Sequence, residues 1–175
     1  FCPRCDEELI SKKQKEELEA SFEEKLKNIL HGSPIPTFVI DNTHRVIYWN
    51  RALEEYSGVK ANDITRTDHH WKAFYDTKRP CIADLLVDKK IHTISQWYPG
   101  KYRASELIDG AYEAIDFFPH VGQSGTWLHF TAAPITDSKG RLSGAVETLQ
   151  DITETKDAEK QIKSLSRQII DIQER

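Results

Sequence analysis

The chain has 175 residues, of which 30% are charged and 38% hydrophobic, with a net charge of −4 at pH 7, and this predicts one soluble domain with exposed helices. Its basic and acidic residues are interleaved with a small acidic surplus, which argues against a surface for nucleic acid. No apolar run approaches the ~18 residues of a membrane span and no signal peptide is visible, so we expect this part of the protein to be cytoplasmic.

The amino-terminal end carries a pair of cysteines. Cys2 and Cys5 form a C-x-x-C pair, a spacing that suits half of a tetrahedral zinc site. No second pair follows, because the remaining cysteine, Cys81, is far away in sequence. The pair is interpreted either as part of a zinc ribbon that extends beyond this chain or as unreactive thiols at the end of a helical linker. The chain begins at Phe1 and contains no methionine, so we expect it to be a piece of a longer protein.

Residues 1–32 are predicted to form a flanking helix. The segment is rich in charge from Asp6 onward and stops at His31 and Gly32, just before a proline. Its apolar residues recur at helical spacing: Leu18, Phe22, Leu26, Ile29 and Leu30. A narrow apolar stripe needs a surface to bury against. We therefore expect the helix to pack on the sheet of the domain or to pair with a second subunit, with a solvated linker as the alternative.

Two strands and a helix are predicted next. Residues 37–40 and 45–49 are apolar runs around a polar turn, as expected of a strand pair. Asn50 then stands at a helix-cap position, where its side-chain oxygen can accept from the free N–H groups of the first turn. The helix is expected to stop at Gly58, and residues 59–64 predict a second short capped turn.

Residues 65–110 are the least regular part of the sequence and are interpreted as a long helical insert. We expect a bend at 68–75, a helix at 79–86, and short helices at 91–97 and 105–108. Aromatic residues of this segment could close one side of a cavity or, alternatively, fill a solid core under a sheet: Trp71, Phe74, Tyr75, Trp97, Tyr98 and Tyr102.

A strand and a hairpin complete the predicted sheet. Residues 112–118 predict a strand and residues 119–125 a loop. From Thr126 the side chains alternate, a turn follows at residues 137–140, and the alternation resumes at Leu142, which indicates a hairpin. Both faces of this hairpin are largely apolar, so we expect one face to cover a core or pocket and the other to meet a helix or a partner chain. Periodicity alone indicates the α+β class.

The last predicted element is a helix over residues 154–175. Apolar residues repeat in it with 4-3-4-3 spacing: Ala158, Ile162, Leu165, Ile169 and Ile172. This spacing predicts the seam of a parallel coiled coil. Two heptads are marginal alone, so we expect the seam to continue into a longer dimer helix or to be supported by the domain.

Two separated motifs resemble the PAS family of sensor domains. Residues 34–41 read PIPTFVID and residues 45–50 read RVIYWN, which resembles the first two strands of the family. The string GRLSGAVETLQDIT at residues 140–153 is similar to the last strand, which in the family ends in an Asp-x-Thr triad before a signalling helix. The resemblance covers residues 33–153. It implies a PAS fold, with a five-stranded antiparallel sheet and helices on one face.

The sequence shows no catalytic constellation, so we do not expect this chain to be an enzyme. His69 and His70 are adjacent and would point apart on a helix, unlike a pair of metal ligands. Haem is not expected, because haem-binding PAS domains usually ligate through a helix on which only His92 is available here. A flavin adduct is not expected either, because the sequence around Cys81 does not match the flavin signature. With the cofactor unknown, the candidate ligand-binding residues are Trp71, Tyr75, His92, Arg103 and His129.

The resemblance implies a sensory module of a bacterial or archaeal signalling protein, with a histidine kinase as the favoured parent. The module would form a homodimer through its flanking helices and bind a small ligand or a partner. The signal would pass through Asp151, Ile152 and Thr153 to a carboxy-terminal output domain. One alternative is a dimerisation module with a filled core and no ligand. Another is the sensor of a diguanylate cyclase or of a sigma-54 activator.

Overall fold

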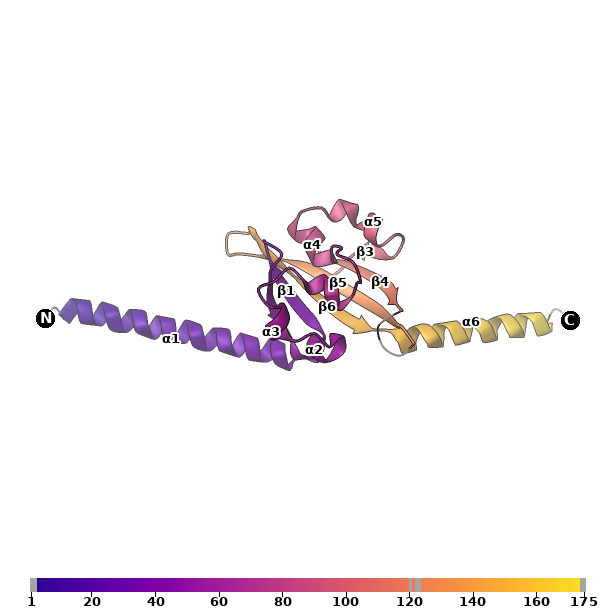
Figure 1. Cartoon of the computed structure of the whole chain (residues 1–175), viewed down its shortest axis with the longest axis horizontal. Coiled ribbons are helices and arrows are strands. Elements are labelled where there is room, and N and C mark those ends of the chain that lie inside the picture. Colours follow the sequence, from indigo (N-terminus) through magenta and orange to yellow (C-terminus); the bar gives the residue numbers. More distant parts are fainter. Residues whose placement is uncertain (1–2, 120, 122–123, 174–175) are drawn as a thin grey trace.

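Two long helices flank a central domain in the computed structural model, which describes residues 3–119, 121 and 124–173. Helix α1 (Pro3–Gly32) precedes the domain and helix α6 (Thr153–Gln173) follows it. The two helices project from the domain in opposite directions (Figure 1). Within the described ranges, no helix is both long enough and apolar enough to cross a membrane.

A six-stranded antiparallel sheet forms the centre of the domain, with the strand order β2-β1-β6-β5-β4-β3. Its strands are β1 (Thr37–Asp41), β2 (Val46–Trp49), β3 (Tyr102–Ala104), β4 (Tyr112–Phe118), β5 (Thr126–Thr136) and β6 (Leu142–Asp151). The expected PAS fold is confirmed, but the expected number of five strands is one too few. The additional strand is β3, which pairs with β4 at the edge of the sheet. It has three residues, all exposed, and therefore lacks the alternation by which a strand is recognised.

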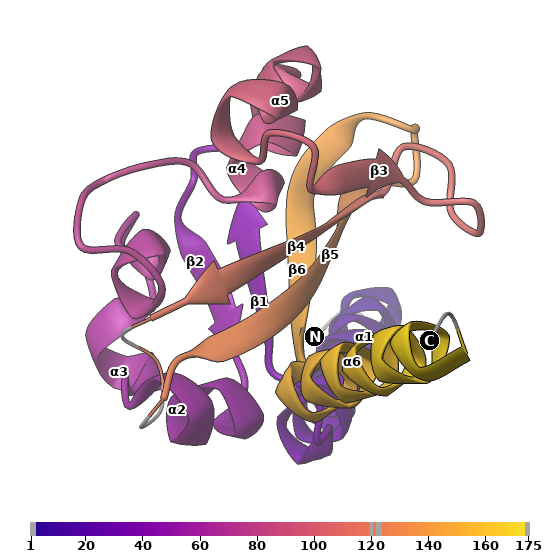
Figure 2. The same cartoon turned by 90° about the vertical axis from the view of Figure 1, so that its right-hand side faces the viewer.

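Short helices cover one face of the sheet. They are α2 (Arg51–Ser57), α3 (Ala61–Ile64), α4 (Ile82–Val87) and α5 (Ile94–Trp97), with the 3-10 turns η1 (His70–Ala73) and η2 (Ile91–Thr93). Figure 2 shows α3, α4 and α5 above and to the left of the sheet and the two flanking helices to its lower right.

One helix expected in the long insert is not formed. Residues 105–108 are an irregular bend between β3 and β4, closed by a hydrogen bond from the Ser105 N–H to the Ala111 carbonyl at 2.8 Å. Leu107 is 94% exposed in this bend. A single helical turn gains little stability without a buried apolar face, so nothing favours a helix here. The short helices expected near residues 79–86 and 91–97 are confirmed as α4, η2 and α5.

The core lies between the sheet and α4. Leu128, Phe130 and Ala132 alternate with more exposed residues along β5, so they share the face that meets the helices. The Phe130 ring packs edge-on against the Phe118 ring of β4, with centroids 5.6 Å apart. All of α4 is buried, and each fully buried apolar side chain contributes about 1.5–3 kcal/mol relative to exposure.

The hairpin of β5 and β6 has the turn that its sequence predicts. The Asp137 carboxylate accepts hydrogen bonds from the backbone N–H groups of Lys139 and Arg141, at 2.8 and 2.9 Å. Further along β6, Gly144 lies directly against β1, where an added Cβ would collide with the Ile40 carbonyl oxygen. The glycine therefore permits close pairing of β1 and β6, the first and last strands in the sequence.

The predicted cap at Asn50 is confirmed and does more than cap one helix. Its side-chain oxygen accepts from the N–H groups of Leu53 at 3.0 Å and Thr37 at 2.9 Å. Its side-chain amide donates to the Ile35 carbonyl at 2.7 Å. The residue is completely buried. Asn50 thus joins the start of β1 to the start of α2.

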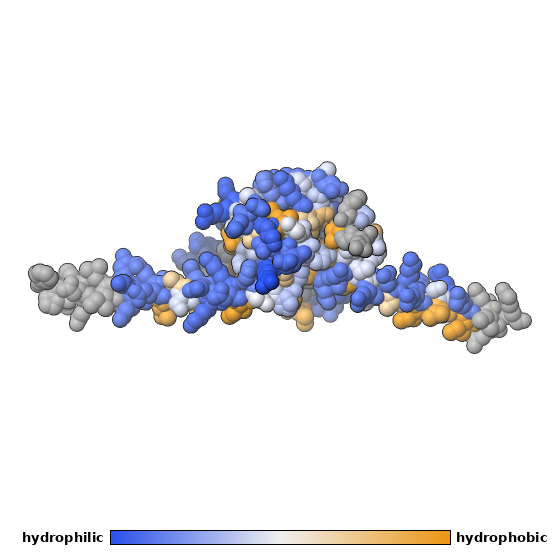
Figure 3. Space-filling model, turned by 60° about the horizontal axis from the view of Figure 1, so that its bottom comes forward, coloured by the Kyte–Doolittle hydropathy of each residue, from blue (hydrophilic) through white to orange (hydrophobic). Residues whose placement is uncertain are grey.

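Helix α1 does not pack on the sheet of its own chain, so that expectation is wrong for the single chain. Its apolar stripe is exposed, with exposed fractions of 72% for Leu18, 61% for Phe22 and 69% for Ile29. Figure 3 shows hydrophobic atoms gathered along one side of both α1 and α6. Near its end α1 is tied to the domain, where the Tyr48 hydroxyl donates to the Lys27 carbonyl at 3.4 Å. Pairing of α1 with a second subunit stays a prediction.

Candidate functional site at the exit of the sheet

The last strand leads directly into the last helix, as the sequence predicts. Strand β6 ends at Asp151 and α6 begins at Thr153. The Asp151 carboxylate accepts from the Thr153 N–H at 2.9 Å, which caps the first turn of the helix. The Thr153 hydroxyl accepts from the Trp127 N–H at 3.0 Å, and the Ile152 N–H donates to the Trp127 carbonyl at 2.9 Å. The start of α6 is therefore held by β5 as well as by β6.

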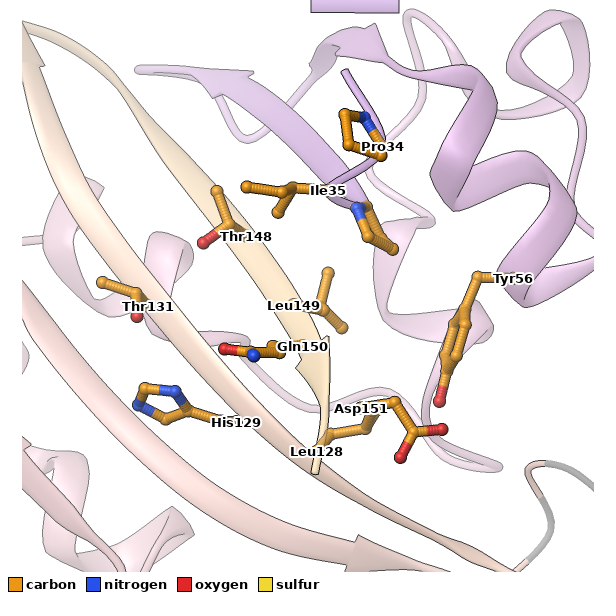
Figure 4. Close-up of a pocket in the computed structure, with 11 residues that line it drawn as sticks. Pro34, Ile35, Tyr56, Leu128, His129, Thr131, Thr148, Leu149, Gln150 and Asp151 are labelled. Carbon is orange, nitrogen blue, oxygen red and sulfur yellow. The ribbon is translucent and has the colours of Figure 1, made fainter. Parts of the chain in front are cut away.

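A pocket of about 520 Å³ opens beside this exit (Figure 4). It lies between the segment that precedes β1, helix α2, and the ends of β5 and β6. Asp151 and the Tyr56 ring of α2 stand at one end of it in Figure 4, and His129 lies toward the other end. Burial raises the pKa of Tyr56, and the nearby charge of Asp151 adds to the effect. A molecule in this pocket would touch the residues that set the direction of α6.

A second pocket, of about 550 Å³, lies on the same face of the sheet, against β3, β4 and β5. Here the Glu113 carboxylate accepts from the Arg103 Nε at 2.7 Å and contacts the His129 Nε2 at 2.6 Å. The hydrogen bond from Arg103, helped by the one to His129, holds the pKa of Glu113 below its usual value. Arg103 and His129 are thus brought together by their contacts with one carboxylate, that of Glu113. Lys156 of α6 also lines this pocket.

Most aromatic side chains of the insert lie on the opposite, helical face, whereas Tyr102 lines the second pocket on the outer face. The Tyr75 and Tyr98 hydroxyls are 3.0 Å apart. The Arg79 guanidinium stacks over the rings of Tyr75, Tyr98 and Trp97, with its carbon 4.1, 4.9 and 5.4 Å from their centroids. Burial raises the pKa of both tyrosines, so both hydroxyls stay protonated. The protein's own arginine occupies the place that a cationic ligand would take among these rings.

The five candidate ligand-binding residues therefore lie in three places. Arg103 and His129 are on the outer face of the sheet, whereas Trp71 and Tyr75 are on the helical face. His92 is exposed in η2, apart from both groups. The structure does not gather these residues around one pocket, and their role in binding stays a prediction. Of the expected half zinc site, Cys2 lies outside the described residues, and for Cys5 only the backbone is described, as for Ile172 of the predicted seam.

A cluster that the sequence analysis did not single out lies on the helical side. The Asp84 carboxylate contacts the His70 Nε2 at 2.8 Å and the His44 Nδ1 at 2.7 Å, and the His44 Nε2 contacts Asp88 at 2.8 Å. These residues line a cavity of about 530 Å³. Although burial opposes it, the hydrogen bonds from His70 and His44 hold the pKa of Asp84 below its usual value. A local signal existed in the i, i+3 spacing of Cys81 and Asp84, but His70 and His44 join them only through the fold.

Glu147 is a second buried acid that the sequence analysis missed. It lies on the face of β6 that meets α4, where it accepts from the Ala83 N–H at 2.8 Å. Burial, and then the charge of Asp84, raises the pKa of Glu147 to about 8. The signal was present in the sequence, because Ala145, Glu147 and Leu149 alternate and must share one face of the strand.

Comparison with known proteins identifies the family to which this fold belongs. A family model described as a PAS domain matches residues 34–154. The PAS domain of BvgS from Bordetella pertussis is 17% identical over 82% of this chain and 96% of that one, with a TM-score of 0.49. An RNA-binding light-oxygen-voltage receptor is 16% identical over 90% of this chain but only 40% of its own, with a TM-score of 0.56.

Further comparison adds one more structure of the same kind. The PAS domain of a protein from Colwellia psychrerythraea is 14% identical over 76% of this chain and 98% of that one, with a TM-score of 0.47. Among curated proteins, no sequence matches. At these identities the solved structures are evidence for the fold alone.

Proposed function

Because this chain belongs to the PAS domain family, we propose that it is a sensory module that passes a signal through a dimeric coiled coil to a carboxy-terminal output domain. The signal would be the binding of a small ligand or a partner. The observation that carries this proposal is the connection from β6 to α6, which is clamped through Trp127 of β5. A change in the sheet would turn the first turn of α6 and, with it, the whole helix.

The pocket beside the exit supports the first step of this proposal. It is bordered by Asp151 itself and by His129, which links it to the second pocket on the same face. A small polar molecule bound there would contact both strands of the hairpin. If the molecule binds one arrangement of the hairpin more tightly than another, it shifts the population toward that arrangement and toward the α6 orientation that goes with it. The difference between the two affinities sets the size of the shift.

The apolar stripe of α6 supports the second step. Ile162, Leu165 and Ile169 are 65%, 59% and 57% exposed. They lie at the predicted seam positions, and a second copy of α6 would bury them as a coiled coil does. A dimer of this kind would suit a histidine kinase as the output domain, because the two subunits of such a kinase act on one another. This part of the proposal rests on membership of the PAS domain family and on the exposed seam of α6.

The proposal can be tested by replacing Asp151 with alanine in a protein that carries this domain together with its output domain. The change removes the carboxylate that caps α6, so we expect altered basal output or a lost response. Asp157→Ala is the matched control, because Asp157 is an exposed carboxylate within α6, six positions after Asp151. Folded Asp151→Ala protein with unchanged basal output and unchanged response would contradict the proposed signal path.

A further inference from the structure

We propose that His70, Cys81 and Asp84 form a binding site for a divalent transition-metal ion, with Zn²⁺ as the ion that suits these ligands best. Each side chain offers one ligand atom, and these three atoms all lie within 4.8 Å of one another. The proposal is independent of the signalling role proposed above.

The three ligands converge from two parts of the insert and are shielded from solvent. His70 begins η1, Cys81 immediately precedes α4, and Asp84 lies in its first turn. Their exposed fractions are only 2%, 1% and 9%. Side chains of these types are seldom buried together unless they are paired or hold a ligand. The convergence is tertiary, because eleven positions of chain separate His70 from Cys81 in the sequence.

The donor set identifies the class of ion. A thiolate sulfur, an imidazole nitrogen and a carboxylate oxygen together match Zn²⁺ and related transition metals, whereas Ca²⁺ and Mg²⁺ take oxygen ligands. The two negative charges of ionised Cys81 and Asp84, with a neutral His70, would offset the two positive charges of the ion, so the ion and its three ligands would carry no net charge. Such neutrality favours an ion in an interior of low polarity.

The surroundings provide support for the ligands and a path for the ion. His44 contacts the second Asp84 oxygen at 2.7 Å and would orient the carboxylate from outside the ligand set. The cavity of about 530 Å³ is lined by His44, His70 and Asp84, so an ion or a water ligand can reach the cluster from it. The His70 Nδ1 is buried and has no hydrogen-bond partner among the described residues, so the ring is anchored at one nitrogen only.

Binding would release the proton of the Cys81 thiol to solvent, because thiolate is the form of cysteine that binds the ion. The 2.8 Å contact between His70 and Asp84 would give way to a bond from each of the two side chains to the ion.

Cobalt(II) is the best probe, because cobalt bound to a thiolate gives a charge-transfer absorption band in the near ultraviolet. The chain contains three cysteines, so a Cys2→Ser, Cys5→Ser protein keeps Cys81 as its only thiol. This background removes the C-x-x-C pair as a competing site. We expect the untagged background protein to bind one equivalent of Co²⁺ with the thiolate band, and Zn²⁺ to displace it.

Variants in this background assign the ligands. Cys81→Ser should abolish the band, and His70→Gln should weaken binding by at least about 100-fold, because losing only an outer-shell partner of a metal ligand already costs about 10–100-fold. His69→Gln is the matched control, because the neighbouring His69 side chain is 48% exposed and is no part of the cluster. It should keep both band and affinity.

The background protein decides the question even if a variant fails to fold. If it is folded by circular dichroism and takes up Co²⁺ without a thiolate band, or takes up none, the site does not exist. A band that persists in folded Cys81→Ser protein would overturn the proposal equally.

Discussion

Asn50 is the residue on which the entry to the sheet depends. Its buried side-chain oxygen accepts hydrogen bonds from the N–H groups of Thr37 in β1 and Leu53 in α2. Its side-chain amide donates to the carbonyl of Ile35, which precedes β1. Side-chain oxygens at helix caps usually satisfy one helix only. The residue thus adds hydrogen bonds between two elements that also share the hydrophobic core.

Replacing Asn50 with alanine should destabilise the domain by at least about 2 kcal/mol, because it removes the cap and leaves buried N–H groups without acceptors. Chemical denaturation followed by circular dichroism measures the change. Asn62→Ala is the control: Asn62 is exposed in α3, and its loss should cost less than about 0.5 kcal/mol. Equal stabilities of the two variants would refute the role given to Asn50.

Glu147 predicts a dependence of stability on pH. Its pKa is raised from 4.5 to about 8 in the folded domain, so the folded state holds this proton more tightly than the unfolded state. The stabilisation of the folded state by this proton is complete at pH values below the unfolded pKa of 4.5. It is lost as the pH rises from there to the folded pKa of about 8. At higher pH the Glu147 carboxylate would be charged and buried, and the contacts described for it include backbone N–H groups and Asp84 but no cation.

Glu147→Gln should remove this dependence. We expect the variant to match the unmodified protein at about pH 4 and to exceed its free energy of unfolding by a few kcal/mol at about pH 9. Denaturation at a series of pH values measures the difference. Glu154→Gln, at an exposed position of α6, should leave the pH profile unchanged. Parallel profiles for Glu147→Gln and the unmodified protein would show that Glu147 ionises normally.

At the scale of elements, the connection between β6 and α6 is the part that the proposed function needs most. Thr153 is the first residue of the helix, yet its hydroxyl binds the backbone of β5. The helix is therefore oriented by a neighbouring strand and not only by the strand that it follows. The short length of the connection, with Ile152 alone between the two elements, leaves little freedom for independent motion.

Thr153→Ala should loosen the first turn of α6 without unfolding the sheet. The loss of one half-buried acceptor should cost about 1 kcal/mol and speed the exchange of the first amide hydrogens of the helix. Hydrogen exchange measured by mass spectrometry reports on it. Thr153→Ser keeps the hydroxyl and should restore protection. Thr155→Ala, at an exposed position two residues further along α6, should have no effect. Unchanged exchange in Thr153→Ala would mean that β5 does not hold the helix.

At the scale of the whole molecule, the flanking helices are the feature that a single chain does not explain. Both present apolar side chains to solvent, between residues 18 and 30 in α1 and between residues 162 and 170 in α6, on one side of the molecule in Figure 3. An isolated helix of this composition is marginal in water. The proposed homodimer would cover these stripes.

Leu165→Lys should shift the chain from dimer to monomer by at least tenfold in dissociation constant, because it places a charge in the middle of the proposed seam. Sedimentation equilibrium measures the change. Ser164→Lys introduces the same charge on an adjacent, outward face of α6 and should leave the association intact. If the unmodified chain is monomeric at high concentration, the seam does not form in this chain alone and the proposed dimer fails.

Most of the elements follow from local sequence. Alternation along β4, β5 and β6, the polar turn after Thr136, and the cap at Asn50 each depend on neighbouring residues, and each is found where the sequence places it. The PAS family could be identified for the same reason, since its two motifs are continuous strings. The short strand β3 was missed because its pairing with β4 is stabilised by the partner strand and not by a pattern of its own.

The sequence by itself determined the order of the elements, the family, and the helix that leaves the last strand, because periodicity, caps and turns act over a few residues. Only the tertiary structure decided which side chains meet. It separated Trp71 from His129 onto opposite faces of the sheet, joined Arg103 to His129 through Glu113, and drew His70 to Asp84 beneath the cavity. Contacts between distant residues depend on how strands and helices pack, and no local pattern in the chain encodes that packing.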